Sequence, residues 1–149
     1  MANSIFVSLT HAPSDIAAVR ALLEAGFRQF GLPAPRAWLH NDATSSTLLT
    51  AGFIMVEGSR DEDQCWISIH RCEEALTDGD GCTVLAGVQT RRNWIFAGVV
   101  AYALCRFAGR SVFNDSGALD GQERYTAASL EAVLARLLQL PARDGSTAN

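Results

Sequence analysis

The longest apolar stretch of the chain runs from Trp94 to Ala108 and contains one charged residue, Arg106. A helix at a protein surface shows polar positions every third or fourth residue, and this stretch barely does. Its fifteen residues would cover about 22 Å as a helix, which is short of the ~30 Å hydrocarbon core of a membrane. The pattern therefore predicts a buried helix, with Asn93 as its N-cap and Gly109 directly after its end.

Alternation of apolar and polar positions predicts strands on both sides of this helix. Residues 65–72 place Cys65, Ile67 and Ile69 at every second position, which is the period of a half-buried strand. Gly52, inside another apolar run, predicts a bulge. The charged segment 59–64 is short enough for the strands before and after it to form a hairpin. The remaining predicted strands cover residues 4–9, 36–40, 48–57, 82–90 and 111–114.

Two amphipathic helices are predicted near the ends of the chain. Pro13 and Ser14 are typical of a helix start, with Ser14 as the capping residue, and Gly26 is typical of a helix end. Thr126 is expected to cap the last helix and Pro141 to follow its end.

The predicted order of elements is β-α-β-β-β-β-α-β-α, with the strands clustered in the middle. Neighbouring strands favour an α+β fold, in which helices pack on an antiparallel or mixed sheet. We expect one domain over residues 1–141, with about five to six strands and about three helices, one of them buried. Residues 142–149 are polar and are expected to form a flexible tail.

The composition narrows the classes of function. The chain has 149 residues, 48% of them hydrophobic, and a net charge of −4. It is therefore expected to be globular and not to bind nucleic acid through charge alone. We find no signal-peptide pattern and no apolar run long enough for a membrane span, so we expect a cytoplasmic protein without a membrane partner.

The sequence predicts neither a metal site nor a cofactor site. The four cysteines have spacings that fit no zinc motif, so we expect reduced, buried thiols. His40 precedes Asp42 by two residues, but no third ligand is evident. Arg91 and Arg92 could hold an anion at the start of the central helix, although such pairs are more often solvated. The cysteines are Cys65, Cys72, Cys82 and Cys105.

Acidic residues gather in three predicted loops, where they would face outward and form an acidic rim suited to a basic partner. We expect Tyr125, beside the third loop, to supply an aromatic anchor for that partner. The predicted partner-binding acids are Asp61, Glu62, Asp63, Asp78, Asp80, Asp115, Asp120 and Glu123.

A resemblance adds to this interpretation. From Asn93 onward an apolar helix leads into the segment from Gly109 to Asp115, then a Gly-containing loop, Tyr125 with Thr126, and a short amphipathic helix. This block resembles the C-terminal half of small bacterial immunity proteins, which neutralise toxins of type VI secretion or contact-dependent inhibition systems. The resemblance implies a cytoplasmic protein without enzymatic activity that binds one cognate toxin.

The alternative hypothesis is a small cytoplasmic enzyme or ligand-binding domain. Its pocket would lie beside the central helix, near Trp94, Tyr102, His70 and Cys72. This hypothesis predicts a deep, partly polar pocket and at least one thiol of altered reactivity.

Overall fold

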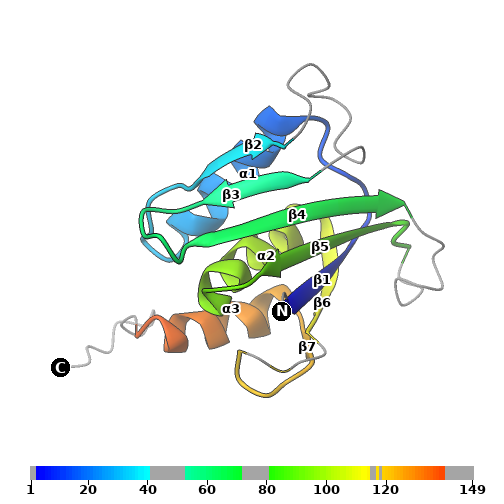
Figure 1. Cartoon of the computed structure of the whole chain (residues 1–149). Helices are drawn as coiled ribbons and strands as arrows, with labels where there is room; N and C mark the ends of the chain where they lie inside the picture. Colours follow the sequence, from blue (N-terminus) through cyan, green and yellow to red (C-terminus); the bar gives the residue numbers. More distant parts are fainter. Residues whose placement is uncertain (1–2, 41–52, 72–80, 115–116, 118, 140–149) are drawn as a thin grey trace.

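The computed structural model describes residues 3–40, 53–71, 81–114, 117 and 119–139. Within these residues, seven strands form one antiparallel sheet in the order β2-β3-β4-β5-β1-β6-β7. Three helices pack on one side of this sheet (Figure 1). The α+β prediction is therefore confirmed.

The elements have the following bounds. The strands are β1 (Asn3–Leu9), β2 (Arg36–Leu39), β3 (Ile54–Glu57), β4 (Gln64–Arg71), β5 (Val84–Thr90), β6 (Gly109–Phe113) and β7 (Arg124–Tyr125). The helices are α1 (Ile16–Arg28), α2 (Trp94–Ala108) and α3 (Ala127–Leu137).

Helix α2 is the centre of the core, as its apolar sequence predicts. Every residue from Phe96 to Cys105 is buried, and the helix contacts α1, α3 and the strands β1, β4, β5 and β6. Asn93 caps the helix, because its Oδ1 atom accepts hydrogen bonds from the backbone N–H groups of Ile95 at 3.0 Å and Phe96 at 3.2 Å. No helix in the described part of the chain combines the length and the apolarity needed to cross a bilayer.

Helix α1 differs from its prediction at both ends. Its N-cap is Asp15, whose Oδ1 atom accepts from the N–H of Ala18 at 2.9 Å, rather than Ser14. Gly26 does not end the helix, which continues to Arg28. A Cβ atom at Gly26 would lie 2.4 Å from the Cβ of Ala103, so the missing side chain lets α1 and α2 approach closely.

The β3–β4 hairpin is confirmed, with Ile54 opposite Ile67 and Glu57 opposite Gln64. Gly109 ends α2 in an extended conformation and begins β6 at once. The two-residue strand β7 was not predicted. The predicted bulge at Gly52 lies outside the described residues.

The sheet has one buried and one open face, because successive strand residues point to opposite sides. The face toward the helices carries the apolar positions, and no helix of the described residues covers the other face. The strand residues buried under the helices are Ile5, Val7, Leu9, Ala37, Ile54, Val56, Cys65, Ile67, Ile69, Val84, Ala86, Val88 and Val112.

One backbone carbonyl of the edge strand β2 is bonded by a side chain from α1. The guanidinium Nε of Arg20 donates a hydrogen bond of 2.9 Å to the backbone carbonyl of Ala37. This carbonyl is therefore already occupied, and the long Arg20 side chain lies along the edge.

Candidate functional site

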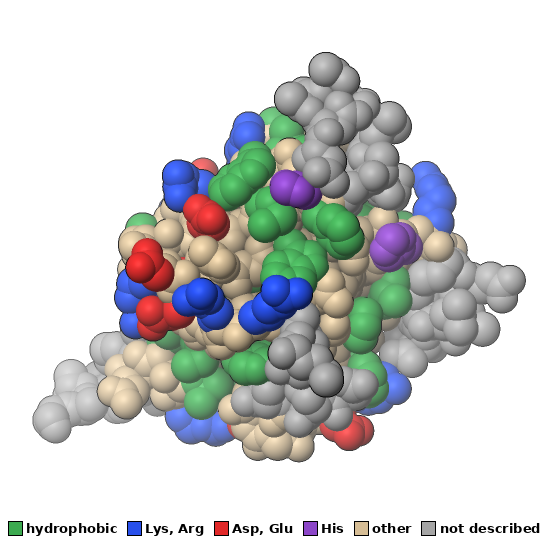
Figure 2. Space-filling model, viewed as in Figure 1, with side chains coloured by type: hydrophobic (Ala, Val, Ile, Leu, Met, Phe, Trp, Pro, Cys, Tyr) green, Lys and Arg blue, Asp and Glu red, His purple; other side chains and the backbone are tan. Residues whose placement is uncertain are grey.

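The open face of the sheet gathers large apolar side chains from five strands. Figure 2 views this face and shows hydrophobic side chains collected over its middle, with arginines nearby. The strand register aligns Trp38, Met55, Trp66 and Gln89 across β2, β3, β4 and β5. All four side chains in this row are only half-buried, so Trp38, Met55 and Trp66 form a partly exposed apolar surface with the Gln89 amide at its end.

Trp66 is held in place by polar neighbours on the same face. Its indole Nε1 donates a hydrogen bond of 2.6 Å to the side-chain oxygen of Gln89. The side-chain nitrogen of Gln89 in turn donates to the hydroxyl of Ser4 at 3.0 Å. This chain of bonds links β4, β5 and β1 and fixes the orientation of the indole ring.

A second aromatic group lies beside this row. Phe6 on β1 is opposite Gly87 on β5 and Phe113 on β6. A Cβ atom at Gly87 would lie 3.2 Å from Oγ of Ser68 and 3.4 Å from Cε1 of Phe6, so the Phe6 ring and the Ser68 side chain both lie close against β5 at this position. Phe6 and Phe113 extend the half-buried aromatic surface toward the β7 side of the sheet.

Arginines lie over three rings of the open face. The guanidinium carbon of Arg36 lies 5.9 Å from the ring centroid of Trp38. The guanidinium carbon of Arg91 lies 5.8 Å from the ring centroid of Trp66. Arg124 lies 5.0 Å from the ring centroid of Phe113. These separations are typical of cation–π contacts.

The open face has more positive than negative charge. Glu57 is the only carboxylate at its described strand positions, and it pairs with Arg36 at 2.6 Å between Oε1 and the guanidinium NH2 nitrogen. No acidic side chain of the described residues forms an ion pair with Arg91. Arg91 therefore keeps its donors available at the surface.

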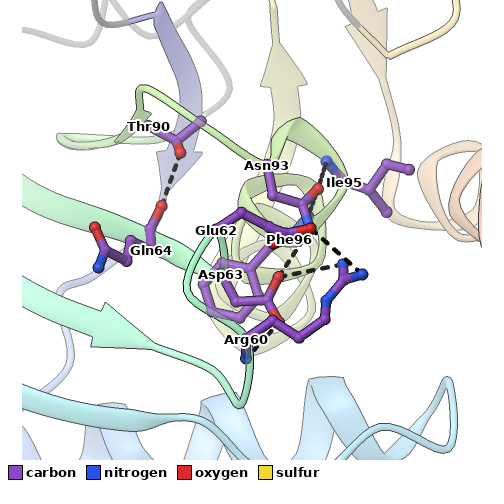
Figure 3. A network of polar contacts seen from close by, with 8 residues as sticks. All are labelled: Arg60, Glu62, Asp63, Gln64, Thr90, Asn93, Ile95 and Phe96. Atoms are coloured by element: carbon purple, nitrogen blue, oxygen red, sulfur yellow. Dashed lines mark hydrogen bonds and ion pairs between the residues drawn. The ribbon is translucent and has the colours of Figure 1, made fainter.

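A second region of interest lies at the start of α2, around the carboxylate of Asp63 (Figure 3). Oδ1 of Asp63 accepts a hydrogen bond of 2.8 Å from Nδ2 of Asn93, and the guanidinium NH2 nitrogen of Arg60 lies 3.5 Å from the same oxygen. The backbone N–H of Gly58 donates to the Asp63 carbonyl at 2.8 Å. These contacts tie the β3–β4 turn to the first turn of α2.

Two hollows adjoin this network and share Arg60, Asn93 and Ile95. The wider hollow has a volume of about 580 Å³ and the narrower one about 180 Å³. Their only buried carboxylate among the described residues is Asp63, which already bonds Arg60 and Asn93. The arrangement thus stabilises the turn and does not present a proton-transfer group to a substrate. The remaining lining residues are Glu62, Arg92, Trp94, Leu119 and Leu137 in the wider hollow, and Phe27, Leu32, Pro33, Gly58, Ser59, Asp63, Phe96, Val99 and Leu138 in the narrower one.

The residues of the alternative pocket hypothesis are not brought together. Trp94 lines the wider hollow, whereas Tyr102 is buried elsewhere on α2 and donates to Glu131 at 2.8 Å between Oη and Oε1. His70 is exposed on β4. Cys72 lies outside the described residues.

Two of the described thiols, Cys65 and Cys105, are poor nucleophiles. Cys65, Cys82 and Cys105 are all buried. Burial, followed by the neighbouring Cys82 thiol, raises the pKa of Cys105 to about 11, and burial also raises the pKa of Cys65. A raised pKa leaves little thiolate at neutral pH, which is the opposite of activation. Across the described ranges, no three His, Cys, Asp or Glu residues group in a way that could hold a metal ion.

The described residues of the predicted acidic rim do not gather on one surface. Asp61 and Glu62 are exposed at the β3–β4 turn, and Glu123 is exposed just before β7. Glu62 is paired with Arg60 at 3.4 Å between Oε2 and a guanidinium nitrogen. Three further predicted partner-binding residues, Asp78, Asp80 and Asp115, lie outside the described residues.

The other predicted partner-binding residues turn inward. Asp63 and Tyr125 are only 8% and 3% exposed, which does not agree with a role as exposed contacts. The Tyr125 hydroxyl donates to Oδ1 of Asp120 at 2.5 Å, and Oδ2 of Asp120 lies 3.4 Å from the Arg136 guanidinium. These side chains thus hold the β7 region to α3.

Titration reflects this inward hydrogen bonding. The hydrogen bond from Tyr125 is the largest influence on Asp120 and lowers the pKa of its carboxyl, with smaller help from the Gln122 N–H and Arg136. Burial, and then the bond to Asp120, raises the pKa of the Tyr125 hydroxyl. At neutral pH the pair is therefore a neutral phenol donating to a carboxylate.

Sequence reasoning missed the open face as a site. The alternation over β4 assigns Trp66 and His70 to a solvent-facing side, and the available signal was a tryptophan at such a position. Comparison with protein-family models, curated proteins and solved structures finds no match to this chain.

Proposed function

We propose that the chain is an immunity-type binding protein that neutralises a cognate bacterial toxin in the cytoplasm. The observation that carries the binding role is the open face, where half-buried aromatic rings lie beside arginines and none of the three described helices covers them. Soluble proteins use such apolar patches mainly as interaction sites.

The chemistry of the open face favours a protein partner. Tryptophan and arginine are enriched among the residues that contribute most to protein–protein affinity. The Trp66 ring is already fixed by Gln89 and Ser4 before any partner arrives, so little side-chain freedom would be lost on binding.

The choice of a toxin as the partner is supported by the sequence pattern from Asn93 onward, which resembles immunity proteins. Asp61 and Glu62, exposed at the neighbouring β3–β4 turn, are candidates for contacts at the rim of the same interface. In this proposal the bound chain neutralises the toxin by covering its active cleft or the path of its substrate.

The test is rescue by co-expression with the product of a neighbouring gene that is toxic when expressed alone. We expect the chain to restore growth and to form a complex with that product, measured by calorimetry on purified proteins. A catalytically inactive version of the same toxin serves as the control for expression load. Absence of both rescue and complex would reject the proposed function.

A further inference from the structure

We propose that the open face binds an acidic segment of the toxin, with Arg91 and the Trp66 ring beneath it at the centre of the contact. This inference rests on the proposed function and names the chemistry of the partner surface. The segment is expected to carry Asp or Glu beside apolar residues, so that the carboxylate meets Arg91 and the apolar part covers the rings.

The distribution of charge on this face carries the first part of the argument. The chain has a net charge of −4, yet the described strand positions of the open face carry one carboxylate, Glu57, which already pairs with Arg36, while Arg91 lies over Trp66 without an ion pair to a described residue. The surface is thus positive within an acidic protein, and an acidic partner segment is complementary to it.

Arg91 differs from Arg36 in the number of guanidinium N–H groups that remain available to a partner. Arg36 is committed to Glu57 at 2.6 Å. Arg91 rests over Trp66, and the described residues give it no ion pair. A guanidinium can stack on an aromatic ring while its N–H groups point outward in the plane of the guanidinium itself. Arg91 can therefore bind a carboxylate without leaving Trp66.

The geometry of the rings explains why the contact would be specific. Trp66 stands in the row between Met55 and Gln89, and its indole N–H is already bonded. The ring therefore offers an apolar surface at a fixed position, with the charge of Arg91 5.8 Å from its centroid. A carboxylate with an adjacent apolar side chain satisfies both, which a lone carboxylate does not.

Other partner chemistries fit less well. A basic segment would place its charge against Arg91, which has no ion pair to a described residue. A nucleic acid carries a charge at every phosphate, and a chain of net charge −4 is poorly matched to such a continuous negative backbone.

The experiment compares variants of the full chain for binding to the purified, catalytically inactive toxin. Arg91→Glu reverses the charge, Trp66→Ala removes the ring and Trp66→Phe keeps an aromatic ring. Arg28→Glu, on α1 and 73% exposed at its side chain, is the control for net charge, and its melting temperature also reports the loss of the Arg28–Glu24 ion pair. Thermal melting of each variant identifies loss of folding, and Arg91→Gln provides a second, uncharged change at an exposed position.

We expect Arg91→Glu and Trp66→Ala to raise Kd by about tenfold or more, and Trp66→Phe and Arg28→Glu to change it by less than about threefold. An Asp or Glu to Arg change in the toxin should restore binding to Arg91→Glu. If wild type binds and all variants bind equally, the inference is rejected while the proposed function stands. If wild type does not bind the toxin, both the inference and the proposed function are rejected. Tighter binding to an oligothymidylate than to the toxin, lost in Arg91→Glu, would also overturn it.

Discussion

The side chain of Asn93 performs two tasks at once, because its Nδ2 donates to the buried carboxylate of Asp63 at 2.8 Å while its Oδ1 caps α2. One amide therefore fastens the β3–β4 turn to the first turn of the central helix. An alanine could do neither, and an aspartate could do only the second.

Asn93→Ala should lower the free energy of unfolding by about 2–4 kcal/mol. Loss of a helix cap costs about 1 kcal/mol, and a hydrogen bond to a charged group is worth about 1.5–3 kcal/mol. Urea denaturation at neutral pH measures this. A loss below about 0.5 kcal/mol would contradict the proposed role of the amide.

Asn93→Asp should show a pH dependence that Asn93→Ala lacks. It keeps an acceptor for the cap but places a second carboxylate against Asp63. Two adjacent carboxylates raise the pKa of one of them in the folded state. The variant should therefore gain stability relative to wild type as pH falls from about 7 to about 4. If the difference in unfolding free energy between wild type and variant is the same at both pH values, the two carboxylates are not closely paired.

Gly26→Ala should destabilise the protein although alanine favours helix. The added Cβ would lie 2.4 Å from the Cβ of Ala103 on α2, and overpacking of this kind costs about 1–3 kcal/mol. Helix propensity returns at most about 1 kcal/mol. The double variant Gly26→Ala with Ala103→Gly should recover part of the loss, and a thermodynamic cycle without coupling would contradict the close approach.

A charge inside α2 should unfold the protein. Val100 and Leu104 are fully buried, so Val100→Asp or Leu104→Asp leaves an unpaired carboxylate in the core. The cost is several kcal/mol out of a total of about 5–15 kcal/mol, and we expect insoluble protein. Phe107→Asp, on the same helix but 37% exposed, is the control and should remain folded in circular dichroism melts.

Tyr125→Phe should weaken the response of stability to acid. Because the Tyr125 hydroxyl lowers the pKa of Asp120 in the folded state, this group stabilises the fold above its unfolded pKa of about 3.9. That contribution is lost as pH falls through the lower, folded pKa. The stability difference between wild type and variant should thus be largest near neutral pH and shrink below about pH 4. Urea denaturation across this range checks it, and a constant difference would contradict the assignment.

Local sequence signals predicted α2 well, because a run without a polar stripe and a capping asparagine both act within a few residues. Gly26 shows where such signals end. Glycine usually marks a helix end, but here a partner 77 positions away in the chain, Ala103, requires it within the helix. The contact depends on how α1 crosses α2, which local pattern does not specify.

The candidate site was hidden for a related reason. Trp66, Phe6 and Phe113 lie on different strands, and only the order β4-β5-β1-β6 brings them to one surface. For two of the acidic residues, the predicted exposure was wrong. Asp63 and Asp120 sit in loops that appear exposed from composition, but each turns inward to bond a partner across the fold, Asn93 or Arg136.

The position of Arg20 at the β2 edge affects how the specificity of this protein for a binding partner can change. The hydrogen bond of Arg20 occupies one carbonyl of the β2 edge, that of Ala37, and the strand at the opposite end of the described sheet, β7, has two residues. Both edges therefore offer a reduced set of main-chain groups to a partner that adds a strand. Recognition through the open face would then depend on side chains alone, so single substitutions could redirect this protein to a diverged partner while the backbone stayed as it is.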